Sequence, residues 1–376
     1  MVLSILDKKI AKPDLIGSYS KDDVIFLLKD ISSLIDEKGN NERERAIQSG
    51  KHYSEMLPVE YKPSSKYLDL FYDSLNKYSM KLATAVGVVA ELILEKKGEN
   101  LVLLSLARAG TPVGILIKRY IKERYLITLP HYSISIIRDK GIDVNAIIYI
   151  LKNHPSALIQ FVDGWTGKGV ITKELSRACN NFRMKYGIEL DSNLGVIADP
   201  CCCSTLYGTR EDFLIPSSFL NSTVSGLVSR TVLCDEFIGK KDFHGAKFYK
   251  ELQDSDLSNY FLEMVSKEFR NVYKEVDIEV NELLKEPLIA GWSGLEEARK
   301  IQKEFSITNI NFIKPGIGET TRVLLRRVPW KILVAESFDK NLDHIFLLAK
   351  EKGVLVESYP LLTYSCCGIV KNMSDN

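Results

Sequence analysis

The sequence predicts an α/β fold: a mainly parallel sheet with flanking helices, followed by a second, smaller α/β unit. Unbroken apolar runs of strand length recur between residues 101 and 199, as in parallel strands that are covered on both faces. Loops and helices alternate with these runs, which is typical of a doubly wound sheet. A chain of 376 residues also exceeds what one hydrophobic core usually serves. We therefore expect one domain over 1–275, including an N-terminal helical segment, and another over 276–376.

The individual elements follow from periodicity and from glycine stops. Residues 66–97 have helical spacing and precede Gly98, so they predict one long helix. Further strands are expected at 101–107, 131–137, 157–163, 193–199, 310–313, 331–335 and 354–358. Further helices are expected at 113–125, 145–153, 170–186, 295–305 and 342–352, and after a loop at 316–321. The polar segment 42–56 predicts a loop or a site-lining segment, and 274–286 predicts a helical linker.

Composition and charge exclude several classes of protein. A content of 45% hydrophobic and 26% charged residues is ordinary for a globular protein, and a net charge of +1 gives no general attraction to nucleic acid or membranes. No apolar run approaches the roughly 20 residues that span a bilayer, and the N-terminus lacks the order of a secretory signal, so a cytoplasmic location is expected. Seven cysteines without C-x-x-C spacing predict buried free thiols rather than disulfides or a zinc site.

A glycine-rich turn in the segment ALIQFVDGWTGKG connects a predicted buried strand to a helix. Glycines let backbone amides face one point, and the helix N-terminus adds a positive dipole end, so the turn predicts a phosphate site. Four apolar residues, an acid and Thr-Gly-x-Gly resemble the signature of type I phosphoribosyltransferases. That resemblance implies a 5-phosphate loop made of Asp163, Gly164, Thr166, Gly167, Lys168 and Gly169.

A second loop occupies the matching place after the first sheet strand. In type I phosphoribosyltransferases a short loop with a basic residue and a glycine contacts pyrophosphate there, which implies this role for Arg108, Ala109 and Gly110. Mg²⁺ is expected to bind through the pyrophosphate of the substrate. Asp163, against the ribose, and Arg138 and Lys140, in a loop that could close over pyrophosphate, are the catalytic candidates. A solvated turn is the alternative for the last two.

Residues 17–264 as a whole resemble one family, on segments that include IQSGKHYSEM, SLARAGTP, FVDGWTGKG and DFHGAKFY. It is a predicted phosphoribosyltransferase family of bacterial tellurite-resistance and stress gene clusters, whose members also carry the label cysteine protease StiP. The resemblance implies phosphoribosyl transfer from phosphoribosyl pyrophosphate to a base-like acceptor, and a homodimer is left open. One alternative is a cysteine protease, in which Cys201, Cys202 and Cys203 could meet His244. Another is a non-catalytic regulator that binds nucleotide or RNA.

The C-terminal unit resembles the Pelota-type RNA-binding domain. Its sequence GIGETTR is similar to the G-x-N-E-x-x-K turn with which kink-turn-binding ribosomal proteins contact RNA, with Gly318 in place of the asparagine. The implied RNA-binding residues are Gly316, Glu319, Arg322 and Arg326. Residues 276–376 hold 13 Lys and Arg against 14 Asp and Glu, which is not the basic balance of a strong RNA binder. Structured RNA and a partner protein both stay open.

Overall fold

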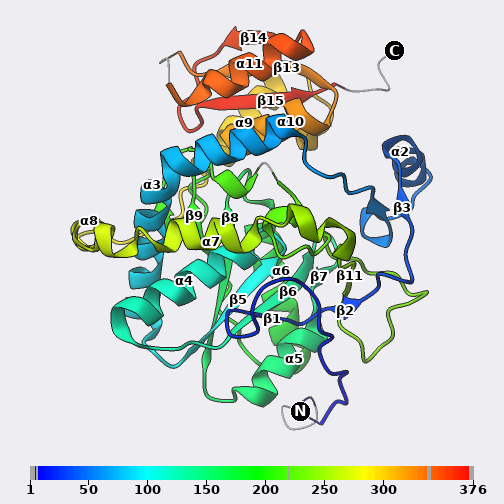
Figure 1. Ribbon diagram of the computed structural model, residues 1–376, viewed down its shortest axis with the longest axis vertical. Coiled ribbons are helices and arrows are strands. Elements are labelled where there is room, and N and C mark those ends of the chain that lie inside the picture. The colour runs from blue at the N-terminus through cyan, green and yellow to red at the C-terminus, as the bar shows by residue number, and fades with distance from the viewer. Residues whose placement is uncertain (1–4, 6, 219, 337–339, 372–376) are drawn as a thin grey trace.

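The computed structural model describes residues 5, 7–218, 220–336 and 340–371, with the backbone alone at 40, 41, 44, 48, 326 and 340. Its central feature is a mainly parallel sheet (Figure 1). The strand order is β1 (Ile25–Phe26), β6 (His131–Ile137), β5 (Leu101–Ala107), β8 (Leu158–Trp165), β9 (Gly195–Ala198) and β10 (Leu206–Thr209). All of these neighbours pair in parallel, and β7 (Gly141–Ile142) is antiparallel to β6. The predicted α/β class with a parallel sheet is thus confirmed.

Helices cover both faces of this sheet. One face packs against α3 (Ser65–Lys97), α4 (Gly110–Tyr125), α7 (Ser258–Ser266) and α8 (Phe269–Leu283). The other face packs against α5 (Val144–Asn153) and α6 (Val170–Tyr186). The connection from β5 leads to β6 on one side, and the chain then returns to β8 on the other side. Ligand sites in such sheets lie at the carboxyl ends of the strands near this reversal.

The C-terminal unit is a second sheet with helices, and it packs on the end of α3 (Figure 1). Its strands lie in the order β12 (Ile313–Pro315), β15 (Cys366–Val370), β13 (Pro329–Val334) and β14 (Leu355–Ser358). Its helices are α9 (Ser293–Glu304), α10 (Ile317–Arg326) and α11 (Asp343–Lys352). Leu324 and Ile345 belong to the same buried cluster as Phe71 of α3, and the Tyr67 hydroxyl donates to the Leu325 carbonyl at 3.2 Å. The two units therefore share apolar packing.

Several elements differ from the sequence-based expectation. The segment expected as a loop contains α2 (Asn40–Gln48), whose polar sequence gives no apolar period to detect. The GIGETT segment is not a loop but the first turns of α10, which begins directly after Gly316. The expected strand 310–313 is largely a single 3₁₀ turn, and β15 was missed because a short apolar run with two cysteines resembles any buried segment. The expected linker lies in α8, which buries Val276 against α3.

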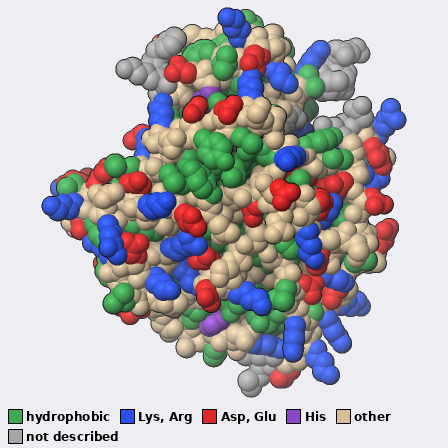
Figure 2. Space-filling view, in the orientation of Figure 1, with side chains coloured by type: hydrophobic (Ala, Val, Ile, Leu, Met, Phe, Trp, Pro, Cys, Tyr) green, Lys and Arg blue, Asp and Glu red, His purple; other side chains and the backbone are tan. Residues whose placement is uncertain are grey.

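Short strand pairs and the surface complete the description. The pairs are β2 (Lys29–Asp30) with β11 (Gly245–Ala246) and β3 (Glu37–Lys38) with β4 (Leu57–Pro58). None of the described helices, including the 33-residue α3, is long and apolar enough to cross a membrane. Figure 2 shows acidic and basic side chains interspersed over most of one face of the molecule, which accords with the net charge of +1.

Candidate functional site

The loop between β8 and α6 is held by contacts inside the chain. The Thr166 hydroxyl donates a hydrogen bond to the carboxylate of Asp199. The Gly167 carbonyl accepts a hydrogen bond from the Tyr364 hydroxyl at 2.6 Å. The Thr166 N–H also donates to the Ala198 carbonyl at 3.0 Å, so both donors of Thr166, which were expected to face a phosphate, are engaged within the chain.

Lys168, in the same loop, is buried and joins the two units. Its ammonium group donates to the carbonyl oxygens of Ile313 at 2.6 Å and Ile310 at 3.0 Å. Burial lowers the pKa of Lys168 to about 8, and the nearby charge of Lys314 adds to this effect. The ammonium group thus stabilises the contact between the loop and the C-terminal unit.

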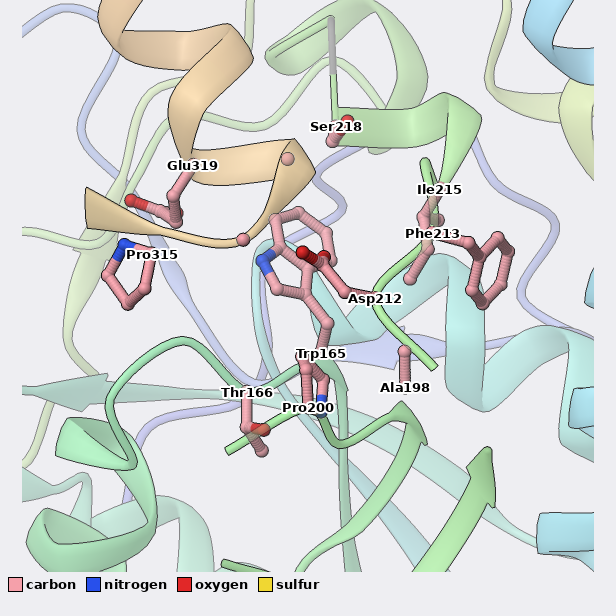
Figure 3. A pocket seen from close by; sticks show the side chains of 12 residues that line it. Trp165, Thr166, Ala198, Pro200, Asp212, Phe213, Ile215, Ser218, Pro315 and Glu319 are labelled. Atoms are coloured by element: carbon pink, nitrogen blue, oxygen red, sulfur yellow. The ribbon is translucent and has the colours of Figure 1, made fainter. Parts of the chain in front are cut away.

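The start of α10 lies next to Trp165 and Thr166 at the beginning of this loop (Figure 3). The Arg322 guanidinium lies over the ring of Trp165, 4.7 Å from its centroid, and donates to the Ser218 carbonyl at 3.2 Å. It also pairs with Glu319 at 3.0 Å. Two of the side chains expected to contact RNA therefore face the first unit.

A carboxylate from the first unit anchors the beginning of α10. Asp212 accepts the N–H groups of Ile317 and Ser365, each at 2.9 Å, and a Cβ on Gly316 would lie 3.2 Å from its Oδ1. The cavity left between the two surfaces measures about 10 Å³, which is about the space of one water molecule. The side chain of Arg326 lies outside the described residues. Structured RNA as a partner stays a prediction.

Asp163 and the segment that starts α4 lie side by side, because β8 and β5 are neighbours. Ala109 caps α4, Gly110 is its first residue, and a Cβ there would lie 3.2 Å from Oδ1 of Asp163. Arg108 lies 3.7 Å from the carboxylate of Glu60. The predicted pyrophosphate loop is thus a helix start that packs against Asp163.

Asp163 has the environment of a titrating group. Its carboxyl group is half-buried and accepts the Gly164 N–H at 2.8 Å. Burial raises the pKa of Asp163 to about 7, against the lowering effects of this N–H and of the Arg322 charge. The carboxyl group therefore changes charge near neutral pH, whereas an ordinary aspartate is ionised well below it.

Replacing Asp163 by asparagine is expected to remove a pH dependence of stability. Between its ordinary pKa of 3.8 and the folded value of about 7, the folded protein holds a proton at Asp163 that the unfolded chain has lost. The contribution of Asp163 to the free energy of unfolding of the wild type therefore falls as the pH rises through that window. Thermal unfolding measured at several pH values in this window should show that the Tm of Asp163→Asn rises relative to that of wild type as the pH increases. Parallel curves for the two proteins would contradict the raised pKa.

Arg138 and Lys140 follow β6 at the same edge of the sheet. The Arg138 N–H donates to the Tyr53 hydroxyl oxygen at 2.9 Å, and its guanidinium lies 5.3 Å from the centroid of that ring. It also reaches Asn311 of the C-terminal unit at 3.5 Å. Lys140 is exposed. Arg138 is thus held between two segments, while Lys140 lies on the surface.

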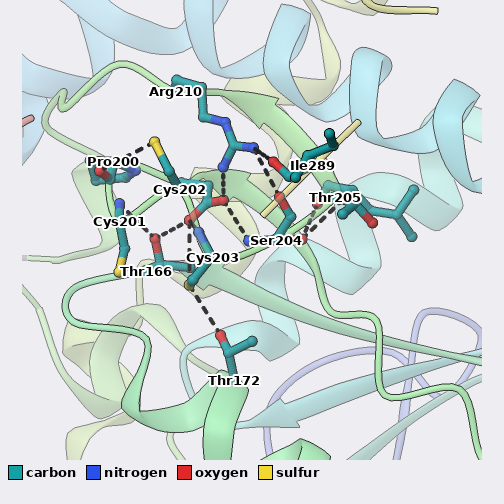
Figure 4. A network of polar contacts seen from close by, with 12 residues as sticks. Thr166, Thr172, Pro200, Cys201, Cys202, Cys203, Ser204, Thr205, Arg210 and Ile289 are labelled. Carbon is teal, nitrogen blue, oxygen red and sulfur yellow. Dashed lines mark hydrogen bonds and ion pairs between the residues drawn. The ribbon is translucent and has the colours of Figure 1, made fainter. Parts of the chain in front are cut away.

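The turn after β9 is organised around the buried carboxylate of Asp199, and Figure 4 shows the network of polar contacts that includes Cys203, Ser204 and Arg210. This group accepts the N–H groups of Ser204 at 2.7 Å and Cys203 at 3.1 Å. It also accepts the Thr166 hydroxyl and forms an ion pair with Arg210. Each oxygen is therefore bound to at least two donors. Asp199 was not among the predicted site residues, although an acid followed by Pro-Cys-Cys-Cys at a strand end was a visible signal.

Three cysteines follow Asp199 in this turn. All seven cysteines of the chain are free, and Cys202 is the one that is not buried. Its backbone has φ of 55°, in the left-handed region that non-glycine residues rarely adopt. The carbonyls of Cys201 and Cys202 accept N–H groups of Gly294 at 3.2 Å and Trp292 at 2.9 Å. The turn thus docks on the N-terminus of α9.

The cysteine–histidine pair of the protease alternative is absent from the described contacts. Among the described contacts of Cys201, Cys202 and Cys203, none involves an imidazole. The His244 imidazole instead contacts the Ser135 hydroxyl at 2.8 Å, and the backbone N–H of His244 donates to Asp143. The sequence could suggest this pairing only from the residue types, because the fold decides how far His244 lies from Cys201, Cys202 and Cys203.

An open pocket of about 370 Å³ lies beside the cysteine turn. It is lined by Cys203, Thr172, Asn193 and Trp292, among others, and the Lys173 ammonium lies 4.9 Å from the centroid of the Trp292 ring. This volume is in the range of small-molecule sites. Within the described residues, no group of three or more His, Cys, Asp or Glu could hold a metal ion. The Mg²⁺ expected through a bound substrate stays a prediction.

Comparison with known proteins identifies relatives of both units. The family described as "Tellurite-like stress resistance cysteine protease StiP" matches residues 17–266, and the "PELOTA RNA binding domain" matches residues 292–372. Cysteine protease StiP of Acinetobacter baylyi is 35% identical over 360 residues, which cover 91% of this chain and 90% of that protein. The predicted resemblances to the StiP family and to the Pelota domain are thus confirmed.

The prediction of a phosphoribosyltransferase is wrong, because the matching family and the relative are both named as cysteine proteases. The predicted transfer of a phosphoribosyl group from phosphoribosyl pyrophosphate to a base-like acceptor is therefore wrong as well. The physical reason lies in the loop that suggested it, since Thr166 and Lys168 are engaged within the chain. With matches over most of its length, the chain belongs to the StiP family of tellurite-like stress resistance cysteine proteases.

Proposed function

We propose that this protein is a cysteine peptidase and that Cys202 is its nucleophile. The observation that carries the proposal is the partial exposure of Cys202, since a nucleophile must be reached by its substrate and the other six cysteines are buried. The names of the family and of the Acinetobacter relative support the same reaction class. The position supports it as well, because the turn lies at the carboxyl edge of a parallel sheet.

The backbone of Cys202 gives a second line of support. A left-handed φ of 55° costs a non-glycine residue about 1–2 kcal/mol. Such strain gathers at functional sites, where the surrounding structure holds it in place. Hydrolases of α/β fold present a nucleophile on a similarly strained turn after a sheet strand. Here Asp199 and the N-terminus of α9 hold the turn from two sides.

Charged and polar groups hold the turn of Cys202 in place. Arg210, which follows β10, forms an ion pair with Asp199, and the positive end of α9 meets the carbonyl of Cys202. Reactive cysteines are partly exposed, as Cys202 is. In the proposed reaction the sulfur attacks the scissile carbonyl carbon, the amine leaves with a proton, and water then hydrolyses the thioester. The contacts of Cys202 provide no imidazole, so the proposal assigns no Cys–His pair.

The pocket beside the turn is the proposed place for a substrate side chain. Hydroxyl and amide groups of Thr172 and Asn193 line it together with the indole of Trp292. A volume of about 370 Å³ is ample for one side chain, and the mixed lining suits a side chain with a polar end. Cleavage sites that share such a side chain would support this assignment.

Peptide cleavage and thiol labelling test the proposal together. The protein is incubated with a diverse peptide library, and products are identified by mass spectrometry before and after treatment with iodoacetamide. We expect cleavage that stops on alkylation, with Cys202 as the first residue labelled, because it is the half-buried cysteine and the other six are buried. His244→Gln should cleave within about threefold of wild type, since His244 does not contact the turn. No cleavage by the folded wild type, or cleavage that survives full alkylation, would contradict the proposal.

A further inference from the structure

The open pocket beside the cysteine turn combines two charged side chains with several hydroxyl groups. Its charged lining residues are Lys173, in the first part of α6, and Asp191, which precedes β9. The Thr172 hydroxyl lies 3.4 Å from the sulfur of Cys203 (Figure 4). Hydroxyl groups of Ser176, Ser192 and Thr205 line the same pocket. Which kind of side chain this pocket favours therefore depends on whether its two charges are balanced.

The negative charge of Asp191 is compensated within the chain. Its Oδ2 lies 3.0 Å from the ammonium group of Lys97, a side chain that is only 5% exposed. Its Oδ1 accepts the Asn193 N–H at 2.9 Å. Each carboxylate oxygen thus has a donor, and a buried cation balances the charge. Asp191 therefore adds little net charge to the pocket.

The positive charge of Lys173 is not compensated in this way. Its side chain is exposed, and its ammonium group lies 4.9 Å from the centroid of the Trp292 ring. An indole attracts a cation through its quadrupole but carries no net charge. Among the ion pairs of the described residues none includes Lys173, and the adjacent carboxylate of Glu174 binds Arg177 at 2.7 Å instead. The pocket therefore has an excess of positive charge.

The hydroxyl groups suit an acceptor better than a second cation. The Thr205 oxygen accepts the side-chain N–H of Asn193 at 2.7 Å, and its own proton can be donated to a bound group. The hydroxyls of Ser176 and Ser192 can each donate one more proton. A carboxylate accepts several such bonds and pairs with Lys173, whereas an ammonium or guanidinium group would be repelled by it. The lining thus matches an acidic side chain.

We infer that this pocket binds a glutamate or aspartate side chain of the peptide substrate and that Lys173 sets this specificity. The inference rests on the proposed function, because the pocket and the proposed nucleophile belong to one turn. Cys203 lines the pocket, and the N–H of Trp292, which lines it too, donates to the Cys202 carbonyl at 2.9 Å. A volume of about 370 Å³ holds either side chain. Peptides are therefore cleaved near acidic residues.

A binding measurement tests the pocket without cleavage. In the full chain with Trp165→Phe and Trp330→Phe, Trp292 is the remaining tryptophan of three, and its fluorescence reports on the pocket. We expect N-acetylglutamate amide to bind at least about fivefold more tightly than N-acetylglutamine amide, because the ion pair and charge-assisted hydrogen bonds need the carboxylate. Calorimetry on the wild type measures the same ratio if the double variant is not folded. Equal affinities, or no binding of either probe, would overturn the inference.

Two lysines of α6 provide the matched variants. Lys173→Gln should lose the preference for the acidic probe. Lys185→Gln should keep it, because Lys185 is also exposed and lies 5.2 Å from an aromatic ring centroid, that of Tyr186, but does not line the pocket. Loss of the preference in both variants, or in neither, would contradict the role of Lys173.

The cleavage sites provide the second readout. In the peptide library, glutamate or aspartate should be enriched at least about fivefold at one fixed position from the cleaved bond, and Lys173→Glu should favour lysine or arginine there instead. Cleavage without this preference overturns the inference and leaves the peptidase proposal intact. Binding that selects the acidic probe, without any cleavage, supports the acidic site and contradicts the peptidase proposal.

Discussion

Replacing Cys202 by glycine is expected to abolish peptide cleavage and to leave the protein at least as stable as wild type. Loss of a nucleophile lowers catalytic rates by factors on the order of 10⁴ to 10⁶. Glycine adopts the observed φ of 55° without strain, which offsets its larger loss of chain entropy. The free energy of unfolding should therefore change by between about 0 and +1 kcal/mol. Peptide-cleavage assays and urea unfolding measure the two effects on the same preparation.

A matched control separates the effect of losing the thiol from the effect of relieving the backbone strain. Leu126 also has a left-handed φ, of 62°, at the end of α4, and its side chain is 88% exposed. Leu126→Gly should raise stability by a similar amount and cleave as wild type does, because it relieves the same strain and removes no thiol. Wild-type cleavage by Cys202→Gly would move the nucleophile elsewhere. A large loss of stability in Cys202→Gly would show that the side chain supports the fold.

Replacing Asp199 by alanine is expected to cost about 3–5 kcal/mol of unfolding free energy, as when one partner of a buried ion pair is removed. Asp199 is fully buried, and its loss would leave the Arg210 guanidinium without its carboxylate partner. The N–H groups of Cys203 and Ser204 and the hydroxyl of Thr166 would lose their acceptor as well. The midpoint of urea unfolding should fall accordingly, with the cysteine turn and the β8–α6 loop affected together.

The ion pair between Lys81 and Glu211 provides the comparison for this prediction. Its side chains are 35% and 69% exposed, so Glu211→Ala should cost no more than about 1 kcal/mol. The difference between the two costs measures the effect of burial, because both variants remove a carboxylate bound to a cation. A cost for Asp199→Ala as small as that for Glu211→Ala would contradict its role as the organising group of the turn.

The sequence by itself determined the α/β class and most of the sheet. The apolar runs 101–107 and 131–137 became β5 and β6 with the expected bounds, because a strand covered on both faces needs a continuous apolar run. The helix expected at 66–97 became α3, one residue longer, since its apolar stripe and Gly98 define it locally. The family was also recognisable from sequence, because it rests on residues in order along the chain.

Only the tertiary structure decided which polar groups are engaged and which are exposed. The turn after β8 has the local chemistry of a phosphate cradle, but residues more than 140 positions away satisfy Lys168, and no local pattern contains that contact. Six cysteines are buried and Cys202 is not, although all seven read alike in the sequence. The burial of Cys201 and Cys203 on either side of Cys202, and the absence of an imidazole among their described contacts, likewise depend on a left-handed turn and on the N-terminus of α9. Residue types and spacing fix local conformation, whereas exposure and partnership arise when distant segments pack and exclude water.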